Sequence, residues 1–292
     1  MTVGARACRQ DDSSVTRNFA RALLIPIVLL VGFVVAGGVG STLLQSIGVM
    51  PLIGQPRLTG ENYLGGGSEV PLSVVVSVGV AGAATLLAAV IGGAIALAIA
   101  AGGWLGRIVG ATSIAVVIIP HLIGAAAIGL LVANSGFLPR LLHIEPNAWP
   151  NLVGSPWWMA VIMEYAWKES AFVGLVVVTA LATRVTQFDE TAALLGARRW
   201  ARVKMVFLPL AAPSLIVAAT ISFVYTLGSY EVAWLLGRTY PEPLAVLAVR
   251  LFNGLSVLSR PQASASAMII VLLCAAASAA GFIAARRTAA WR

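Results

Sequence analysis

The chain has few charged residues for its length. Of its 292 residues, 10% are Asp, Glu, Lys or Arg, whereas 59% are hydrophobic and the mean hydropathy is +0.93. A soluble domain carries about 25% charged residues, so this chain has too little charge to cover its own surface in water. The composition excludes a soluble globular protein and predicts an integral membrane protein.

Cysteine and histidine are also scarce. Cys8 precedes the first apolar run and Cys274 lies within the last one, so we expect no disulfide or metal framework. His121 and His143 give little material for a metal site or a proton relay. The sequence contains no Walker A motif, no G-x-S-x-G and no H-E-x-x-H. We therefore expect no catalytic residue, no cofactor and no metal, and an intramembrane enzyme is disfavoured.

Six apolar runs are long enough to cross a bilayer, which needs about 20 residues per helix. They cover residues 22–44, 71–101, 108–133, 157–181, 214–236 and 264–284. The first run has about 23 residues, which exceeds the apolar core of a secretory signal peptide, the competing interpretation. The pattern predicts an all-α membrane domain over residues 22–284, with tails at 1–21 and 285–292.

Two of the runs contain residues that affect helix geometry. In the second run, Gly79, Gly82 and Gly92 are expected to let neighbouring helices approach closely. In the third run, Pro120 is expected to kink the helix because it has no amide hydrogen to donate. His121 follows this kink, and we expect a packing role for it.

The basic residues between the runs are distributed unevenly. If both termini are cytoplasmic, 13 of the 19 Lys and Arg residues lie inside and five outside, and Lys168 falls within the fourth run. Those outside are Arg57, Arg140, Arg238, Arg250 and Arg260. Cytoplasmic loops carry an excess of Lys and Arg, so this distribution predicts cytoplasmic termini and also explains the net charge of +8 without nucleic acid.

One charged stretch, residues 186–213, interrupts the apolar pattern, and we call it the coupling segment. Thr186 is placed to cap a short helix whose first turn carries Asp189 and Glu190, and Gly196 permits a sharp turn after it. Pro209 and Pro213 suit the first turn of a following helix, so we expect the first helix to break before them.

The order of residues in the coupling segment resembles a known motif. Glu190, Ala192 and Gly196, followed by Leu208-Pro209, resemble the E-A-A-x-x-x-G loop of the permease subunits of ABC importers, with Thr191 in place of the first Ala. The alternative is an ordinary charged loop between two membrane helices. The resemblance assigns ATPase coupling to Asp189, Glu190, Ala192, Ala193, Gly196, Ala197, Leu208 and Pro209.

The resemblance also implies a fold and a set of partners. The expected fold is the six-helix type I permease fold of ABC importers, in the inner or plasma membrane. The expected partners are a cytoplasmic ABC ATPase dimer, a second permease subunit that differs from this chain, an extracytoplasmic solute-binding protein and membrane lipid. The chain itself is then a transport subunit, and a separate subunit hydrolyses ATP.

Charged residues within the apolar runs are candidates for the translocation pathway. Glu164, Lys168 and Glu169 lie in the fourth run, and Glu164 and Lys168 are spaced to pair along a helix. Tyr230 and Glu231 lie toward the outer end of the fifth run. A charge at the bilayer centre costs about 2.5–3.5 kcal/mol, so these groups should face the bundle interior or a wet cavity. Either they line the pathway, or they form an internal ion pair.

Three stretches resemble one branch of the permease family. They begin at Ile119 (IPHLIG), Glu164 (EYAWKESAF) and Gly228 (GSYEVAWLLGRTYPEPLAVL), and they are similar to spermidine and putrescine permeases. That branch often has Pro where this chain has Ala233. The resemblance favours a polyamine as solute, with sugar, iron and thiamine as alternatives. A self-sufficient secondary transporter or channel is the competing function, but it would not need the coupling segment.

The charge distribution predicts the topology directly. Reporter domains fused after Leu181 and after Trp291 should report a cytoplasmic position, and a reporter fused near Asn147 should report an external one. Paired phosphatase and fluorescent-protein fusions measure this. A cytoplasmic signal at Asn147 would mean that one span has been miscounted.

Overall fold

A computed structural model describes the backbone of residues 4–64, 69–181 and 184–290, and the side chains of residues 24–64, 69–181 and 188–288. Within these residues every regular element is a helix, as the sequence predicts. The longer helices are α1 (Gly4–Ser46), α3 (Glu69–Ala100), α4 (Gly103–Ile118), α5 (His121–Val132), α7 (Met159–Leu181), α8 (Arg184–Leu194), α10 (Leu208–Gly228), α12 (Leu244–Asn253) and α13 (Arg260–Ala290). The short ones are α2 (Glu61–Leu64), α6 (Phe137–Leu141), α9 (Arg199–Arg202), the π-helix η1 (Val203–Phe207), α11 (Glu231–Leu236) and the 3-10 helix η2 (Val257–Ser259).

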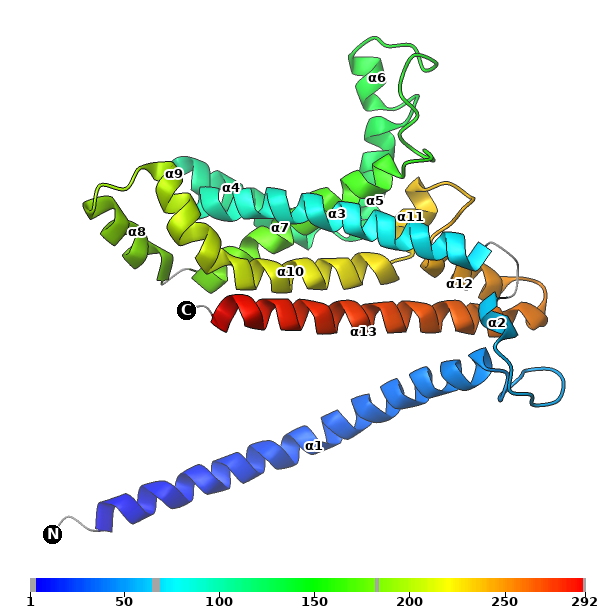
Figure 1. The fold of residues 1–292 in the computed structure, drawn as a ribbon, viewed down its shortest axis with the longest axis horizontal. Helices are drawn as coiled ribbons and strands as arrows, with labels where there is room; N and C mark the ends of the chain where they lie inside the picture. The colour runs from blue at the N-terminus through cyan, green and yellow to red at the C-terminus, as the bar shows by residue number, and fades with distance from the viewer. Residues whose placement is uncertain (1–3, 65–68, 182–183, 291–292) are drawn as a thin grey trace.

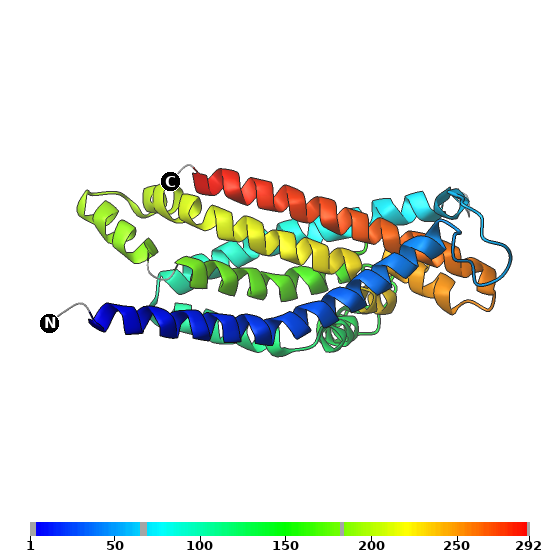
Figure 2. The same ribbon diagram turned by 90° about the horizontal axis from the view of Figure 1, so that it is seen from below.

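Three long helices, α3, α10 and α13, lie roughly parallel and form the middle of an elongated bundle (Figure 1). α3, α10 and α13 run side by side, and α7 packs against α3 (Figures 1 and 2). α8 and α9 lie at one end, together with the end of α13 and the start of α1, whereas α2, α11 and α12 lie at the other. The two ends of the chain are thus on the same side as the coupling segment. This arrangement fits the predicted topology, although the direction in the membrane stays a prediction.

In the described part of the chain, five helical segments are long and apolar enough to cross a membrane. They are Leu24–Ser46, Glu69–Ala100, His121–Leu141, Arg199–Gly228 and Val257–Thr288. α7 has 23 residues, enough to cross a bilayer, but its three charged residues lie toward the middle of the helix and not at its ends, which sets it apart from these five. The predicted count of six spans depends on α7 and stays a prediction.

Close packing between α3 and α7 depends on two glycines. A Cβ on Gly92 would lie 2.8 Å from both the Ser170 carbonyl oxygen and Val173 Cβ, and one on Gly174 would lie 2.5 Å from Ile95 Cγ2. The prediction for Gly92 is therefore confirmed. It is wrong for Gly79 and Gly82, because no atom lies within 4 Å of a Cβ built at either position.

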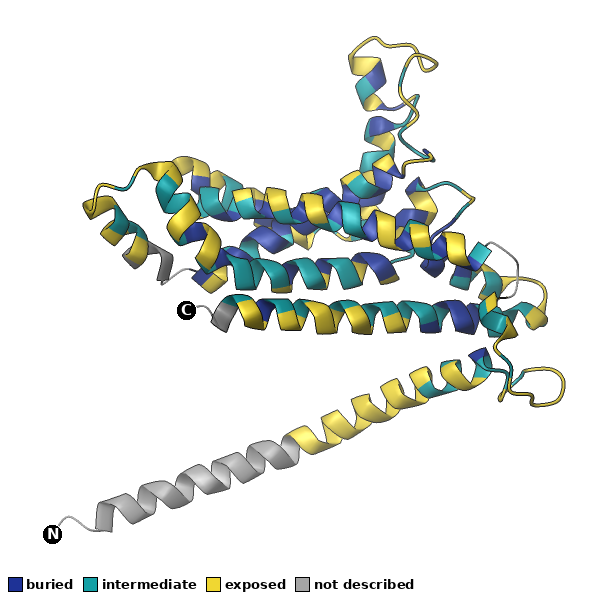
Figure 3. Ribbon diagram, in the orientation of Figure 1, coloured by how far each residue is buried: buried dark blue, intermediate teal, exposed yellow. Residues whose placement is uncertain are grey.

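α1 stands away from the rest of the bundle. It leaves the other helices at an angle, and every residue from 24 to 39 is exposed within this chain (Figures 1 and 3). Its end is attached where Asn62 donates to the Ser46 carbonyl oxygen and where Ser264 donates to Gln45. The apolar surface of α1 must therefore be covered by something outside the chain. The helix also extends back to Gly4, beyond the apolar run predicted at residues 22–44.

The third predicted span is two helices, because the chain breaks at Ile119-Pro120. Ile119 is extended, with φ −67° and ψ 126°, as expected for a residue that precedes proline. The sequence predicted a kink in one helix at Pro120, whereas in the structure the helix is interrupted there and divides into α4 and α5. The predicted fifth span also divides, into α10 and α11, and the external loop predicted at residues 237–263 contains α12.

The two adjacent glycines of α3 allow a controlled test of the packing. Gly92→Ala should lower the free energy of unfolding by about 1–3 kcal/mol, because the added methyl group overpacks the contact with α7. Gly93→Ala is the matched control, since nothing lies within 4 Å of a Cβ there. Thermal unfolding in detergent measures both. Equal midpoints for the two variants would contradict the packing.

Candidate functional site

The coupling segment begins with helix α8, which ends in a hydrogen-bonded glycine turn. Gly196 has φ +81°, and its N–H donates to the Ala193 carbonyl oxygen at 3.0 Å. The N–H of Ala197 donates to the Ala192 carbonyl oxygen, also at 3.0 Å. These bonds make a Schellman cap, in which the residue with positive φ is usually glycine. The spacing of Ala192, Ala193 and Gly196 thus has a direct structural role.

The predicted start of this helix was wrong. α8 begins at Arg184, so Thr186 lies within the helix and is not its N-cap residue. The side chain of Thr186 lies outside the described residues. Asp189 and Glu190 consequently sit in the middle of α8 and not in its first turn.

The far end of the coupling segment exposes large apolar side chains. Leu194 is 90% exposed and Leu195 is 83% exposed at the tip, and Trp200 and Met205 are exposed beyond the turn. Glu190 is exposed on the same helix. Because exposed apolar groups beside charged ones are typical of interaction surfaces, this tip is suited to bind a partner protein.

An ion pair holds α8 against the next helix. Arg202 Nη1 donates to Asp189 Oδ2 at 2.6 Å, which joins α8 to α9. Beside this pair lies a cavity of about 430 Å³ between the end of α3 and the coupling segment. The ion pair therefore fixes the position of α8 relative to the helix that follows.

The predicted break before Pro209 is confirmed, because α8 ends at the Gly196 turn and Pro209 lies in the first turn of α10. Pro213, also expected in a first turn, lies inside α10. From Arg199, however, the chain is helical up to Gly228. The π-helix η1 explains how the helix accepts Pro209. The N–H of Leu208 donates to Val203, five residues earlier, and Pro209 follows at the start of α10. In a regular helix the proline ring would clash with the carbonyl group four residues earlier. A wide turn of this kind moves the preceding carbonyl groups away from the ring. Leu208 and Pro209 thus join α9 to α10 within one continuous helix.

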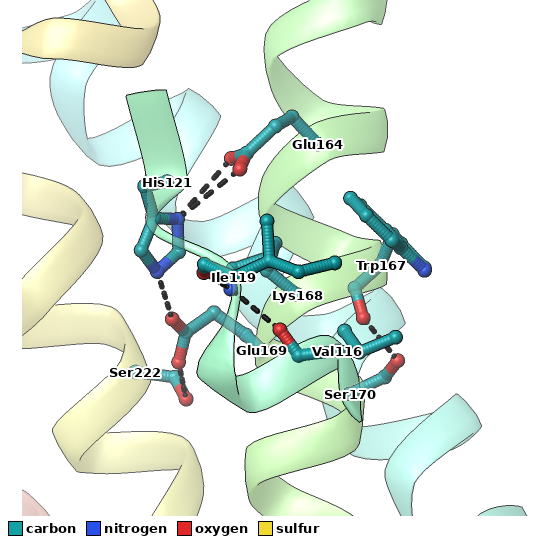
Figure 4. A network of polar contacts seen from close by, with 9 residues as sticks. All are labelled: Val116, Ile119, His121, Glu164, Trp167, Lys168, Glu169, Ser170 and Ser222. Carbon is teal, nitrogen blue, oxygen red and sulfur yellow. Dashed lines mark hydrogen bonds and ion pairs between the residues drawn. The ribbon is translucent and has the colours of Figure 1, made fainter. Parts of the chain in front are cut away.

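A second group of polar residues meets inside the bundle, where α4, α5, α7 and α10 come together (Figure 4). His121 Nδ1 lies 3.2 Å from Glu164 Oε1, and His121 Nε2 lies 3.4 Å from Glu169 Oε1. Ser222 donates to Glu169 Oε2 at 2.5 Å. Lys168 Nζ donates to the carbonyl oxygens of Val116, at 2.7 Å, and of Ile119. We call His121, Glu164, Lys168, Glu169 and Ser222 the ion network.

The ion network corrects two expectations. Glu164 pairs with His121 from another helix, and Lys168 binds carbonyl oxygens at the end of α4, so the expected pair of Glu164 and Lys168 along α7 does not form. His121 is a central member of the network, beyond the packing role expected for it. Its position directly after Pro120 was the available signal, because a break in a membrane helix exposes backbone groups that attract charged side chains.

The pathway candidates fall into two groups by position. Glu164, Lys168 and Glu169 are buried within this chain, at 0%, 4% and 7% exposure. Tyr230 and Glu231 lie just beyond α10, at the start of α11, which is at the end of the bundle opposite the coupling segment (Figure 1). Glu231 is exposed and forms no hydrogen bond or ion pair with any described residue, and Tyr230 stacks on Trp234 with ring centroids 6.0 Å apart. The structure therefore brings the first three together and leaves Glu231 open to a ligand or a partner.

Comparison with known proteins gives a consistent result. Residues 88–289 match the family model described as binding-protein-dependent transport system inner membrane component. The chain is 34% identical over 74 residues to the molybdenum transport system permease protein ModB of Azotobacter vinelandii, covering 25% of this chain and 33% of that protein. It is 27% identical over 112 residues to the sulfate transport system permease protein CysT of Escherichia coli (strain K12), covering 38% and 40%. Each match thus spans well under half of the relative's length.

Solved structures show the same fold. A bacterial ABC transporter involved in the import of the acidic polysaccharide alginate superposes with a TM-score of 0.74 at 18% identity, covering 95% of this chain and 99% of that one. The alginate transporter in complex with an alginate pentasaccharide-bound periplasmic protein gives 0.72 at 17% identity, covering 94% and 96%. At these identities the likeness concerns the fold alone.

Proposed function

Because this chain belongs to the inner-membrane permease family of binding-protein-dependent ABC importers, we propose that it forms part of the translocation pathway for a small solute and is driven through its coupling segment by a cytoplasmic ATPase. The chain is a transport subunit of a multi-pass membrane assembly. ATP hydrolysis belongs to the partner, with which the coupling segment makes contact.

The observation that carries this proposal is the construction of the coupling segment. Its tip exposes Leu194, Leu195 and Glu190, which suit a groove on a partner protein. Its base is held to α9 by the ion pair of Asp189 and Arg202. α9 continues through η1 into α10, so a force on the tip is carried along a single helix into the bundle. A loop with no mechanical role needs neither the cap nor the ion pair.

The partners follow from the same proposal. The coupling segment meets the ATPase dimer in the cytoplasm, where both termini lie, and the opposite end of the bundle meets a solute-binding protein. One of the similar solved structures contains such a periplasmic protein. The exposed apolar faces of the bundle contact lipid and a second permease subunit, which we expect to be a different chain.

The pathway is proposed to run along α5, α7, α10 and α11. Tyr230 and Glu231 face the solute at its outer part, since both lie at the end of α10 and Glu231 is exposed. Glu164, Lys168 and Glu169 form the wall farther in, where the ion network holds the broken helix.

The solute is proposed to be small and charged. The sequence around Glu231 resembles that of polyamine permeases, and an exposed carboxylate with no ion-pair partner among the described residues favours a cation. The two relatives are named as permease proteins of molybdenum and sulfate transport systems, so the oxyanions molybdate and sulfate are the competing candidates. Sugar, iron and thiamine are the remaining alternatives.

Substitutions in the coupling segment should separate assembly in the membrane from coupling. Glu190→Lys reverses a charge at the tip, and Gly196→Val places a β-branched residue at φ +81°, which disrupts the Schellman cap. We expect both proteins to reach the membrane but to lose ATPase copurification and uptake. Glu145→Lys, at an exposed position in the loop after α6, is the matched control. Normal copurification and uptake in both variants would contradict the docking role.

The charge of Glu231 can be tested against the solute. Uptake of spermidine, putrescine, molybdate, sulfate and a neutral sugar is measured in vesicles that contain equal amounts of assembled complex. If the solute is a cation, Glu231→Gln should abolish its uptake, whereas Glu61→Gln, another exposed carboxylate, should leave it unchanged. Uptake of an oxyanion or the sugar alone by the unmutated complex would rule out the polyamine proposal.

A further inference from the structure

The break between α4 and α5 exposes backbone groups of opposite polarity. The carbonyl oxygens of Val116 and Ile119 lie at the C-terminal end of α4, which carries partial negative charge, and Lys168 binds both. The N-terminal end of α5 carries partial positive charge, and Glu164 lies close to it: a Cβ on Gly124 would be 2.9 Å from Glu164 Oε1. The side chains of α7 thus complement both ends of the break.

His121 connects the two carboxylates. Nδ1 faces Glu164 and Nε2 faces Glu169, at 3.2 and 3.4 Å. An ionised carboxylate only accepts hydrogen bonds, so both contacts are hydrogen bonds only if both ring nitrogens carry a hydrogen, which makes the ring an imidazolium ion. Two carboxylates, Lys168 and an imidazolium ion then sum to zero charge. Such neutrality matters because an uncompensated charge within a membrane protein is expensive.

The surroundings of His121 fit a cationic ring. From α7 it is faced by Glu164, Glu169 and Tyr165, with Lys168 on the same helix, and from α10 by Tyr225. The ring centroid of Tyr225 lies 4.8 Å away and that of Tyr165 lies 6.0 Å away. Aromatic rings at such distances favour a cation. α4 and α5 carry no other charged group facing it in the described residues.

The same contacts connect α5 to the coupling segment. Glu169 holds His121 with one carboxylate oxygen and accepts from Ser222 with the other, and Ser222 lies on α10. α10 continues from α9 and η1, with Ser222 about 20 Å along the helix from Leu208. A displacement of the coupling segment therefore reaches α5 through Ser222, Glu169 and His121.

We propose that His121, as an imidazolium ion held between Glu164 and Glu169, is a positioning residue that makes α5 move together with α7 and α10 during transport. The contacts are independent of any partner, and the role in transport rests on the proposed function. His121 itself need not touch the solute.

The charge of the ring can be tested by spectroscopy, because the chain has only two histidines. The permease is labelled with 15N-histidine and assembled with unlabelled partners, and NMR reports the protonation of each ring nitrogen. His143→Asn removes the other signal, and Asn tolerates the positive φ of 54° at that position. At neutral pH both nitrogens of His121 should carry a hydrogen. A neutral ring would overturn the proposal.

The role in transport is tested by ATPase coupling in reconstituted complexes. The measured quantity is the ratio of ATPase rates with and without the solute-binding protein. That protein is loaded with the solute, of the five tested above, that vesicles containing the unmutated complex take up. His121→Gln should reduce this ratio at least about fivefold, and His121→Lys should restore part of it by returning the charge. The KM for ATP should stay unchanged. His143→Asn should leave the ratio unchanged.

A third variant decides the outcome if His121→Gln does not assemble. Ser222→Ala removes only the contact with α10, and it should reduce the ratio while leaving the NMR signal of His121 protonated. A normal ratio in Ser222→Ala, or in an assembled His121→Gln complex, would overturn the positioning role. An unmutated complex that shows neither stimulation nor uptake would instead contradict the proposed function, and the NMR result would still test the charge of the ring.

Discussion

A helix that breaks inside an apolar bundle must satisfy the backbone groups that the break sets free, and much of this structure follows from that requirement. Where water does not reach these backbone groups, neighbouring side chains must form the hydrogen bonds with them. Lys168 binds the carbonyl oxygens at the end of α4, and this places a cation on α7. Glu164, Glu169 and His121 then balance its charge. The charged residues that make α7 unlike the other spans are thus explained by a proline on a different helix.

The two polar regions differ in how they are stabilised. The ion network is enclosed within one chain, and its groups satisfy one another. Among the described residues, the ion pair of Asp189 and Arg202 and a helix cap hold the coupling segment at its base, whereas Leu194 and Leu195 remain exposed. A rigid base with an exposed tip suits a part that binds another protein, because the order required for binding is already present in the chain.

The sequence predicted most features that depend on neighbours along the chain. The apolar runs and the turn at Gly196 could be recognised from composition and spacing. Features that depend on other helices could not. Lys168 was expected to bind Glu164 one turn away, because the sequence does not reveal that the carbonyl groups of α4 lie nearer. His121 was undervalued for the same reason, and the sequence did not reveal the π turn that joins α9 to α10 at Pro209.

The separation of α1 from the bundle has a consequence for assembly. The described side chains of α1, from Leu24 on, supply no residue to the three buried hydrophobic clusters, which are built from α3, α5, α7 and the helices after them. The apolar length from Leu24 to Ser46 can therefore enter the lipid as an independent hydrophobic segment, before the rest of the chain has been made. Its attachment at Ser46 and Gln45 then joins this segment to the bundle at one end.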